Sequence, residues 1–208
     1  MNPEGFNVKQ QIEKEMNSAF KNYSEFFGLD ADDLESKKTL DVGAGSAFFT
    51  QYVREKLHNT EAYALDMLKR RKDNPEWFIC QDAQDTHLPD ESFDLITAKS
   101  MFPMFIQPEY PTKSYGIEMD YKNFIEEMLR ILKPGGTLMF DISTPEGIIK
   151  LNLKYSESEE ETQKIKNKAE NCKIIIDYLN SLNSENIFCE LIPKKSDGYI
   201  VKIIKLLA

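Results

Sequence analysis

The segment Thr39–Thr50 constrains the fold of this chain more than any other stretch. Its short apolar run stops at two glycines, Gly43 and Gly45, and an apolar pattern with helical spacing begins directly after them. Glycine has no Cβ, so the chain can turn tightly there and a ligand can approach the backbone closely. The N–H groups that open a helix lack partners within it and favour a carboxylate or phosphate. The pattern predicts a strand that turns sharply into a helix, either as an ordinary turn or as a ligand-binding loop.

From Lys38 onward, strand-like and helix-like segments alternate along the chain. This alternation predicts an α/β fold, with a parallel sheet covered by helices on both faces. The last two strand-like segments are separated only by a turn rich in Asp, Gly and Ser, which predicts a β-hairpin. We expect strands at residues 40–42, 62–65, 77–80, 93–98, 137–142, 186–192 and 199–207, and helices at 47–57, 121–132 and 159–183.

The first 37 residues precede the alternating pattern and are predicted to form a helical cap over 1–37, followed by one domain over 38–208. Gly28 lies where the helix is expected to stop. The apolar residues of this segment recur on one helical face, namely Ile12, Met16, Ala19, Phe20, Tyr23 and Phe27.

Composition excludes several classes of partner. The formal charge of −9 disfavours a large nucleic-acid footprint, and the short basic run 69–72 is interpreted as a solvated helix face or linker. No stretch approaches the ~18 consecutive apolar residues of a membrane span. The three cysteines are far apart and only two histidines are present, so neither a disulfide framework nor a metal site is expected. We therefore predict a cytoplasmic protein without nucleic-acid or membrane partners, and leave its oligomeric state open.

Charged residues follow three of the expected strands. In open parallel sheets, ligands bind outside the carboxyl ends of the strands. Asp66 follows the second strand, Asp82 the third, and Lys99 the fourth. Asp66 lies about 20 residues beyond Gly45, the spacing at which an acid accepts hydrogen bonds from a ribose diol. A single Asp after a strand is usually a helix cap, but two of them beside a glycine turn favour a nucleotide-like ligand.

Four blocks of the sequence resemble the signatures of class I S-adenosylmethionine-dependent methyltransferases, most closely those of the small-molecule and lipid-quinone type. The resemblance covers residues 38–143, and the C-terminal helix and hairpin match the closing elements of that family. It implies a Rossmann-like seven-stranded sheet, mostly parallel, with an antiparallel C-terminal hairpin. The four blocks are Asp41–Gly45, Leu65–Met67, Cys80–Ala83 and Leu132–Gly136.

The resemblance also implies a cofactor site for S-adenosylmethionine. The turn Gly43-Ala44-Gly45 would hold the methionine part, with backbone N–H groups near its carboxylate, and Asp41 would orient this loop. Asp66 would bind the ribose hydroxyls. The remaining expected contacts are Met67 packed on the adenine, Asp82 and Ala83 at its polar edge, and Lys99 at the end of the fourth strand.

A dinucleotide is the competing cofactor. Its fingerprint requires Gly or Ala at the last position of Gly-x-Gly-x-x-Gly, where this chain has Phe48. A bulky ring there would crowd a pyrophosphate, so the pattern disfavours a nicotinamide enzyme.

Two features depart from the resemblance. Ala47 stands where many family members have a third glycine, a small change. The segment Met67–Glu76 is shorter than the dozen or so residues that a parallel crossover normally needs. The placement of the third strand, and of Asp82 after it, depends on this short connection.

The segment Met101–Tyr121 is rich in aromatic residues and prolines. Two interpretations stay open: a lid that forms an aromatic acceptor pocket with the N-terminal helix, or a well-packed surface loop. The candidate pocket residues are Ser100, Phe102, Phe105, Tyr110 and Tyr115.

Methyl transfer from a sulfonium requires mainly alignment and exclusion of water. A general base is needed only where the acceptor must lose a proton, and His87 is a weak candidate for that role. The sequence lacks the Asn/Asp-Pro-Pro-Tyr/Phe block and the Pro-Cys of nucleic-acid base methylation. We therefore expect a small-molecule acceptor. The alternatives are a protein side chain as acceptor and a non-catalytic module that binds the cofactor or a partner.

Overall fold

The computed structural model describes residues 3–68, 75–107, 116, 118–156, 158–194 and 197–207. The strands are β1 (Thr39–Val42), β2 (Ala62–Leu65), β3 (Phe78–Ile79), β4 (Phe93–Ala98), β5 (Leu132–Ser143), β6 (Ile187–Pro193) and β7 (Gly198–Lys205). The helices are α1 (Pro3–Phe27), α2 (Asp32–Glu35), α3 (Phe48–Lys56), α4 (Pro103–Ile106), α6 (Tyr121–Ile131), α7 (Pro145–Asn152) and α8 (Glu159–Ser181), with a 3₁₀ turn η1 (Leu153–Tyr155).

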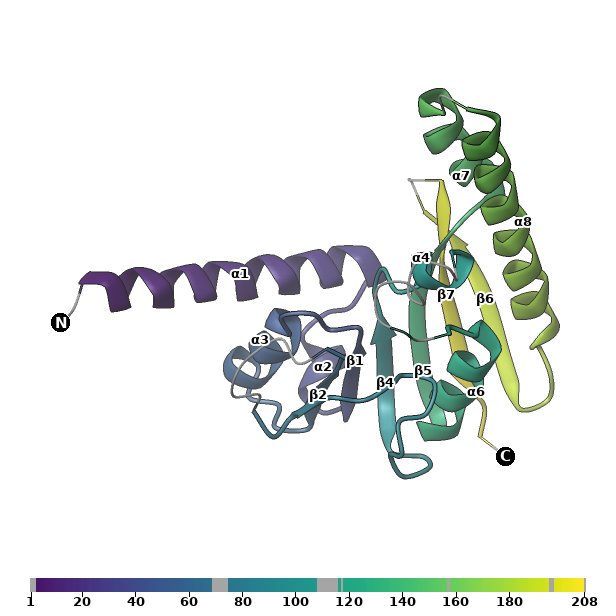
Figure 1. The fold of residues 1–208 in the computed structure, drawn as a ribbon. Coiled ribbons are helices and arrows are strands. Elements are labelled where there is room, and N and C mark those ends of the chain that lie inside the picture. The colour runs from purple at the N-terminus through teal and green to yellow at the C-terminus, as the bar shows by residue number, and fades with distance from the viewer. Residues whose placement is uncertain are drawn as a thin grey trace.

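The strands form one seven-stranded sheet in the order β3-β2-β1-β4-β5-β7-β6 (Figure 1). The pairings from β3 to β5 are parallel, whereas β7 runs antiparallel to both β5 and β6. The strand order changes direction at β1, which has β2 on one side and β4 on the other. Open α/β sheets bind their ligands at such a point. The predicted α/β fold, its mostly parallel sheet and its antiparallel C-terminal hairpin are confirmed.

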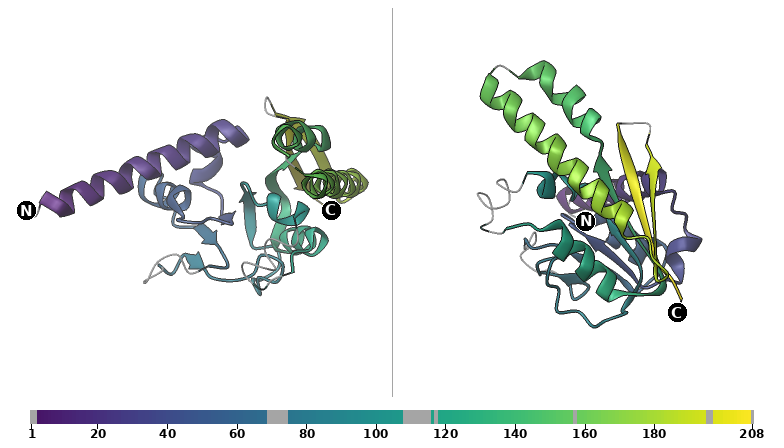
Figure 2. Two further views of the ribbon diagram at one scale, coloured as in Figure 1. Left: turned by 45° about the horizontal axis from the view of Figure 1, so that its top comes forward. Right: turned by 90° about the vertical axis from the view of Figure 1, so that its right-hand side faces the viewer.

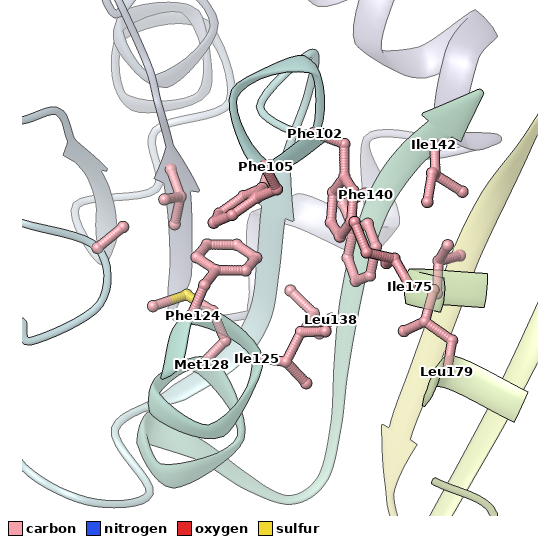
Figure 3. Packing of buried hydrophobic residues seen from close by; sticks show 14 of the residues in the cluster. Phe102, Phe105, Phe124, Ile125, Met128, Leu138, Phe140, Ile142, Ile175 and Leu179 are labelled. Atoms are coloured by element: carbon pink, nitrogen blue, oxygen red, sulfur yellow. The ribbon is translucent and has the colours of Figure 1, made fainter. Parts of the chain in front are cut away.

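Helices cover both faces of the sheet, as predicted. On one face, α4, α6 and α8 pack over the side chains of Leu40, Leu138 and Phe140. Figure 3 shows α6 with its apolar stripe against β5 in this layer. On the other face, α2 and α3 pack with the end of α1 around Leu95 and Met139. Neighbouring residues of one strand thus point to opposite cores, as the two-residue period of a strand requires.

The N-terminal helix α1 lies along α3 and then projects away from the sheet (Figures 1 and 2). Its C-terminal half docks by ring stacking: Phe20 stacks on Tyr52 at 4.2 Å and Tyr23 stacks on Phe49 at 4.1 Å between ring centroids. Gly28 ends the helix with φ of 69°, and its N–H donates to the carbonyl of Ser24. The predicted helix and its glycine stop are confirmed.

Two helices were not predicted. The single turn α4 places Pro103 at its first position, where proline is tolerated. Helix α7 begins at Pro145, and the Thr144 hydroxyl caps it by accepting from the N–H of Gly147. Both signals are present in the sequence, but the apolar pattern of each segment is too short to indicate a helix by itself.

The third strand pairs with the second in parallel, with Ala64 opposite Phe78 and Leu65 opposite Ile79. The short connection therefore does reach the edge of the sheet, although residues 69–74 lie outside the described residues. No helix among the described residues combines the length and apolar character that a membrane crossing requires.

Candidate functional site

The register of the sheet brings the expected site residues together. Val42 of β1 lies opposite Leu65 of β2, so the glycine turn and Asp66 begin at the same level. Asp41 lies opposite Thr97 of β4, which places Lys99 beside the same strand ends. The carboxyl ends of these strands meet at one edge of the sheet, as the sequence pattern predicted.

A cavity of about 220 Å³ opens at this edge. Most of the predicted cofactor residues line it, together with Ser100 from the predicted acceptor pocket. Four methionines form much of its described apolar wall, so the cavity combines carboxylates, the ammonium group of Lys99 and a thioether-rich surface. Its described lining residues are Gly43, Leu65, Asp66, Met67, Leu68, Asp82, Ala83, Lys99, Ser100, Met101, Met104 and Met119.

The glycine turn is tied to the end of β2 by its own backbone. The N–H groups of Gly43 and Ala44 both donate to the carbonyl of Leu65, at 2.8 and 3.1 Å. The N–H of Gly45 donates to Oδ2 of Asp66 at 2.9 Å. Ala44 and Gly45 therefore shape the turn without lining the cavity. Gly43 has φ of 69°, and a Cβ there would lie 2.3 Å from Sδ of Met101, so only glycine fits without displacing that wall.

Ala47 occupies the position of the missing third glycine. It adopts the left-handed conformation, with φ of 55°, directly before α3. Its buried side chain packs with Ala64 and Phe78, which explains why a small residue is needed there. The substitution that distinguishes this chain from many family members thus preserves the geometry of the turn.

Asp41 is buried, with 2% of its surface exposed. Its Oδ1 accepts from the hydroxyl of Tyr23 at 2.9 Å and from that of Thr97 at 3.3 Å. Its Oδ2 has no hydrogen-bond partner among the described residues. Burial raises the pKa of Asp41 to about 7, because removing the carboxylate from water outweighs the two hydrogen bonds and the attraction of Lys99.

Asp66 and Asp82 face the cavity from neighbouring strand ends. Asp66 is 6% exposed, and its Oδ1 accepts from the N–H of Leu68 at 2.8 Å while its Oδ2 holds the glycine turn. Asp82 accepts from the N–H of Gln84 at 2.9 Å, which fixes the turn after β3. Both carboxylates are therefore oriented by the backbone before any ligand binds.

Lys99 extends from the end of β4 over the aromatic rings of α1. Its Nζ lies 5.7 Å from the ring centroid of Tyr23 and 5.0 Å from that of Phe26. Within the part of the chain that the structure describes, no carboxylate forms an ion pair with it. Lys194, from the turn between β6 and β7, approaches the same Phe26 ring at 3.8 Å but pairs with Oδ2 of Asp141 at 3.7 Å.

The predicted acceptor residues separate into three groups. Ser100 lines the cavity, whereas Phe102 and Phe105 are buried in the core, where Phe102 stacks on Phe140 at 4.6 Å (Figure 3). Met101 and Met104 of the same segment line the cavity, and both interpretations of the segment, a lid or a packed loop, stay predictions. Tyr110 and Tyr115 lie outside the described residues.

A second cavity, of about 630 Å³, lies between α4, α6 and α8. Phe105 contributes to its wall, and Met119 lines both this cavity and the first one. The two cavities therefore share a wall. The remaining described lining residues are Glu118, Asp120, Tyr121, Asn123, Asn171, Ile174 and Ile175.

His87 lies on the surface, with 73% of its side chain exposed, and its Nδ1 is 2.9 Å from Oδ1 of Asp85. It is not among the described residues that line either cavity, and its role as a base stays a prediction. Sequence reasoning missed Tyr23, Lys194 and three of the four cavity methionines, Met101, Met104 and Met119. A tyrosine on an apolar helical stripe is itself a signal, since a buried hydroxyl needs a partner.

Comparison with known proteins agrees with the predicted domain and fold. Residues 40–140 match the family described as a methyltransferase domain. A malonyl-[acyl-carrier protein] O-methyltransferase of Halorhodospira halophila is 25% identical over 133 residues, which cover 60% of this chain and 41% of that protein. The matched region thus spans less than half the length of this curated relative.

Solved structures with low sequence identity share the fold. The plantazolicin methyltransferase BpumL, in complex with a monoazolic desmethylPZN analog and SAH, has a TM-score of 0.55 at 14% identity, covering 99% of this chain and 91% of that one. A putative S-adenosylmethionine-dependent methyltransferase from Listeria monocytogenes has a TM-score of 0.61 at 11% identity, covering 89% and 98%. Residues 40–140 thus form a methyltransferase domain, and the fold and the strand-end acids agree with the class I S-adenosylmethionine-dependent methyltransferases.

Proposed function

We propose that this protein transfers a methyl group from S-adenosylmethionine to a small-molecule acceptor. The observation that carries the proposal is the cavity at the ends of β1, β2 and β4, which gathers the glycine turn, Asp66, Asp82 and Lys99 around one space. The sequence places these residues far apart, and only this fold brings them to one edge of the sheet.

The donor and acceptor groups of the cavity fit the cofactor. A carboxylate offers about four acceptor sites, so Asp66 can hold the glycine turn and still accept from ribose hydroxyls. Asp82 and Ala83 offer a polar edge to the adenine, and Met67 an apolar face. The unpartnered Oδ2 of buried Asp41 suits the ammonium group of the methionine part. When bound, the cofactor supplies a methyl group that its sulfonium has already activated.

The protein then has to align the acceptor and exclude water. Met101, Met104 and Met119 form a flexible apolar wall beside the glycine turn, which suits both tasks. Ser100 is a polar group on the same wall, and its N–H is fixed by donation to Asp141 at 2.6 Å. We assign no general base.

A small-molecule acceptor is supported by the second cavity, whose volume of about 630 Å³ lies within the range of small-ligand pockets. Met119 borders both cavities, so an acceptor there would lie next to the cofactor site. The net charge of −9 disfavours a nucleic-acid acceptor. The named acceptors of the relatives differ, a malonyl-carrier protein for one and a desmethylPZN analog for another, so they do not fix the acceptor here.

The proposal is tested with methyl-labelled S-adenosylmethionine and a cell extract separated into dialysable metabolites and macromolecules. We expect label in the dialysable fraction with the wild type and with Asp85→Ala, which removes an exposed acid outside the cavity. Asp66→Ala should lower cofactor affinity roughly 10- to 100-fold, since it removes charge-assisted hydrogen bonds. Label in macromolecules alone would indicate a protein acceptor. Cofactor binding without any transfer would indicate the non-catalytic module.

A further inference from the structure

The glycine turn has no backbone donors to spare for an anion. The family resemblance places the cofactor carboxylate near the N–H groups of this turn, but here Gly43 and Ala44 donate to Leu65 and Gly45 donates to Asp66. A carboxylate needs donors or a counter-ion when it leaves water. The charge must therefore be met by another group at this end of the cavity.

Lys99 is the cation among the described residues that line the cavity. It lines the cavity together with Gly43, and it is held over the rings of Tyr23 and Phe26. Throughout the described ranges no carboxylate forms an ion pair with it, although the more distant charge of Asp41 attracts it. An ammonium group in a cavity, without a carboxylate partner, favours an anionic ligand.

Lys194 provides the contrast. It approaches the same Phe26 ring, but Asp141 balances its charge and it is absent from the described lining of the cavity. Burial lowers the pKa of Lys194, Asp141 opposes that shift, and the charge of Lys99 adds to it. The two lysines are thus close enough to repel each other. This repulsion favours an anion beside Lys99, which has no ion-pair partner among the described residues.

We propose that Lys99 is the counter-ion of the carboxylate of the cofactor's methionine part, held in position by Tyr23 and Phe26 of α1. The inference rests on the proposed use of S-adenosylmethionine. The buried Oδ2 of Asp41, which has no hydrogen-bond partner among the described residues, offers the complementary acceptor for the ammonium group. Lys99 and Asp41 together match the two charges of an amino acid, and α1 contacts both of them.

The test measures binding of two ligands by calorimetry: S-adenosylmethionine and its decarboxylated form, which lacks only the carboxylate. The wild type should bind the first at least about 10-fold more tightly, the effect of one charge-assisted contact. Lys99→Met should lose this preference, with weaker binding of S-adenosylmethionine and binding of the decarboxylated form changed less than about 2-fold. Lys194→Met, the matched control, and Lys99→Arg should both keep the preference.

Three results would overturn the inference: a wild type without preference, a Lys99→Met variant that keeps the preference, or a variant that loses both ligands equally. If Lys99→Met does not fold, the wild type provides a second test of the charge pairing. Raising the salt concentration should reduce its preference for the ligand that carries the carboxylate. A preference that salt leaves unchanged would contradict the charge pairing. Failure of the wild type to bind either ligand would refute the cofactor assignment itself, a result distinct from equal binding of both.

Discussion

The carboxyl group of Asp41 lies between α1, β1 and β4, and its pKa of about 7 links the stability of the fold to pH. In the unfolded chain an aspartate releases its proton near pH 3.9. Between that value and about 7, the folded state therefore holds a proton that the unfolded state has lost. The Asp41 carboxyl group therefore lowers the free energy of unfolding as pH rises through that window, and its contribution is constant above it.

We expect Asp41→Asn to become more stable relative to the wild type as pH rises from about 4 to 7, with a difference of up to about 4 kcal/mol. Asparagine keeps an oxygen that accepts from Tyr23 and carries no charge to bury. Urea unfolding of both proteins between pH 4 and 8 measures the difference, and the other titrating groups cancel in it. Asp85→Asn, at an exposed acid, should run parallel to the wild type. A constant difference for Asp41→Asn would refute the buried-charge explanation.

The sequence predicted the site residues that depend on local pattern. Gly43, Asp66 and Asp82 were found because each directly follows a strand, and parallel strands bring their carboxyl ends to one edge. Tyr23 and Lys194 were not found, since their positions depend on how α1 and the C-terminal hairpin dock on the sheet. That docking is determined by contacts between segments far apart in the chain, which a sequence pattern does not encode.

At the scale of elements, the loop after β3 is anchored to α6 by one acid. Oε1 of Glu127 accepts from the N–H and the hydroxyl of Thr86, at 2.8 and 2.5 Å. Arg130 donates to both of its oxygens at 2.7 Å. Burial alone would raise the pKa of Glu127, but the hydrogen bonds from Arg130 and Thr86 lower it to about 2. The same loop carries Asp82 and Ala83 to the cavity.

Glu127→Gln should lower the free energy of unfolding by about 1–3 kcal/mol at pH 7, because Arg130 and Thr86 lose their charged acceptor. The depressed pKa makes this contribution complete above about pH 4.3, and it is lost as pH falls towards 2. Denaturant unfolding at pH 7 and pH 3 measures both statements. Glu126→Gln, an exposed neighbour on the same helix, should be nearly neutral. Equal effects of the two substitutions would show that the anchor contributes nothing.

Periodicity alone was less successful for short elements than for long ones. The long amphipathic helices α1 and α8 were predicted, whereas α4 and α7 were not, because one or two turns carry too few apolar repeats. Strand β5 starts at Leu132, directly after α6, whereas the sequence predicted a strand over 137–142. Leu132 pairs with Phe93 of β4, the register then shifts, and pairing resumes at Thr137. Gly135 lies in the shifted part with φ of 81°, a conformation that favours glycine.

At the scale of the whole molecule, the sheet separates two hydrophobic cores and places the ligand cavity at the carboxyl ends of its strands. The helices α4, α6 and α8 bury one face of β1 and β4, and α1, α2 and α3 bury the other. The cavity takes residues from β2, the turns after β1 and β3, and the end of β4. A ligand bound there contacts several strand ends together with Met104 of α4, so its binding energy should stabilise the folded state.

S-adenosylhomocysteine, the cofactor without its transferable methyl group, should therefore raise the temperature of unfolding. A ligand that binds only the folded state adds about 2.7 kcal/mol at 100 times its Kd, and about 1.4 kcal/mol for each further tenfold increase. For a chain of this size, we expect a shift of roughly 5–11 °C at the first concentration. Calorimetric scans over three decades of ligand measure it. Asp66→Ala should shift only at concentrations 10- to 100-fold or so higher, in proportion to its weaker binding. Binding to the folded state alone raises the unfolding temperature continuously over this concentration range. A shift that stops rising with ligand concentration would contradict this binding. A shift of equal size in Asp66→Ala would contradict binding at this cavity.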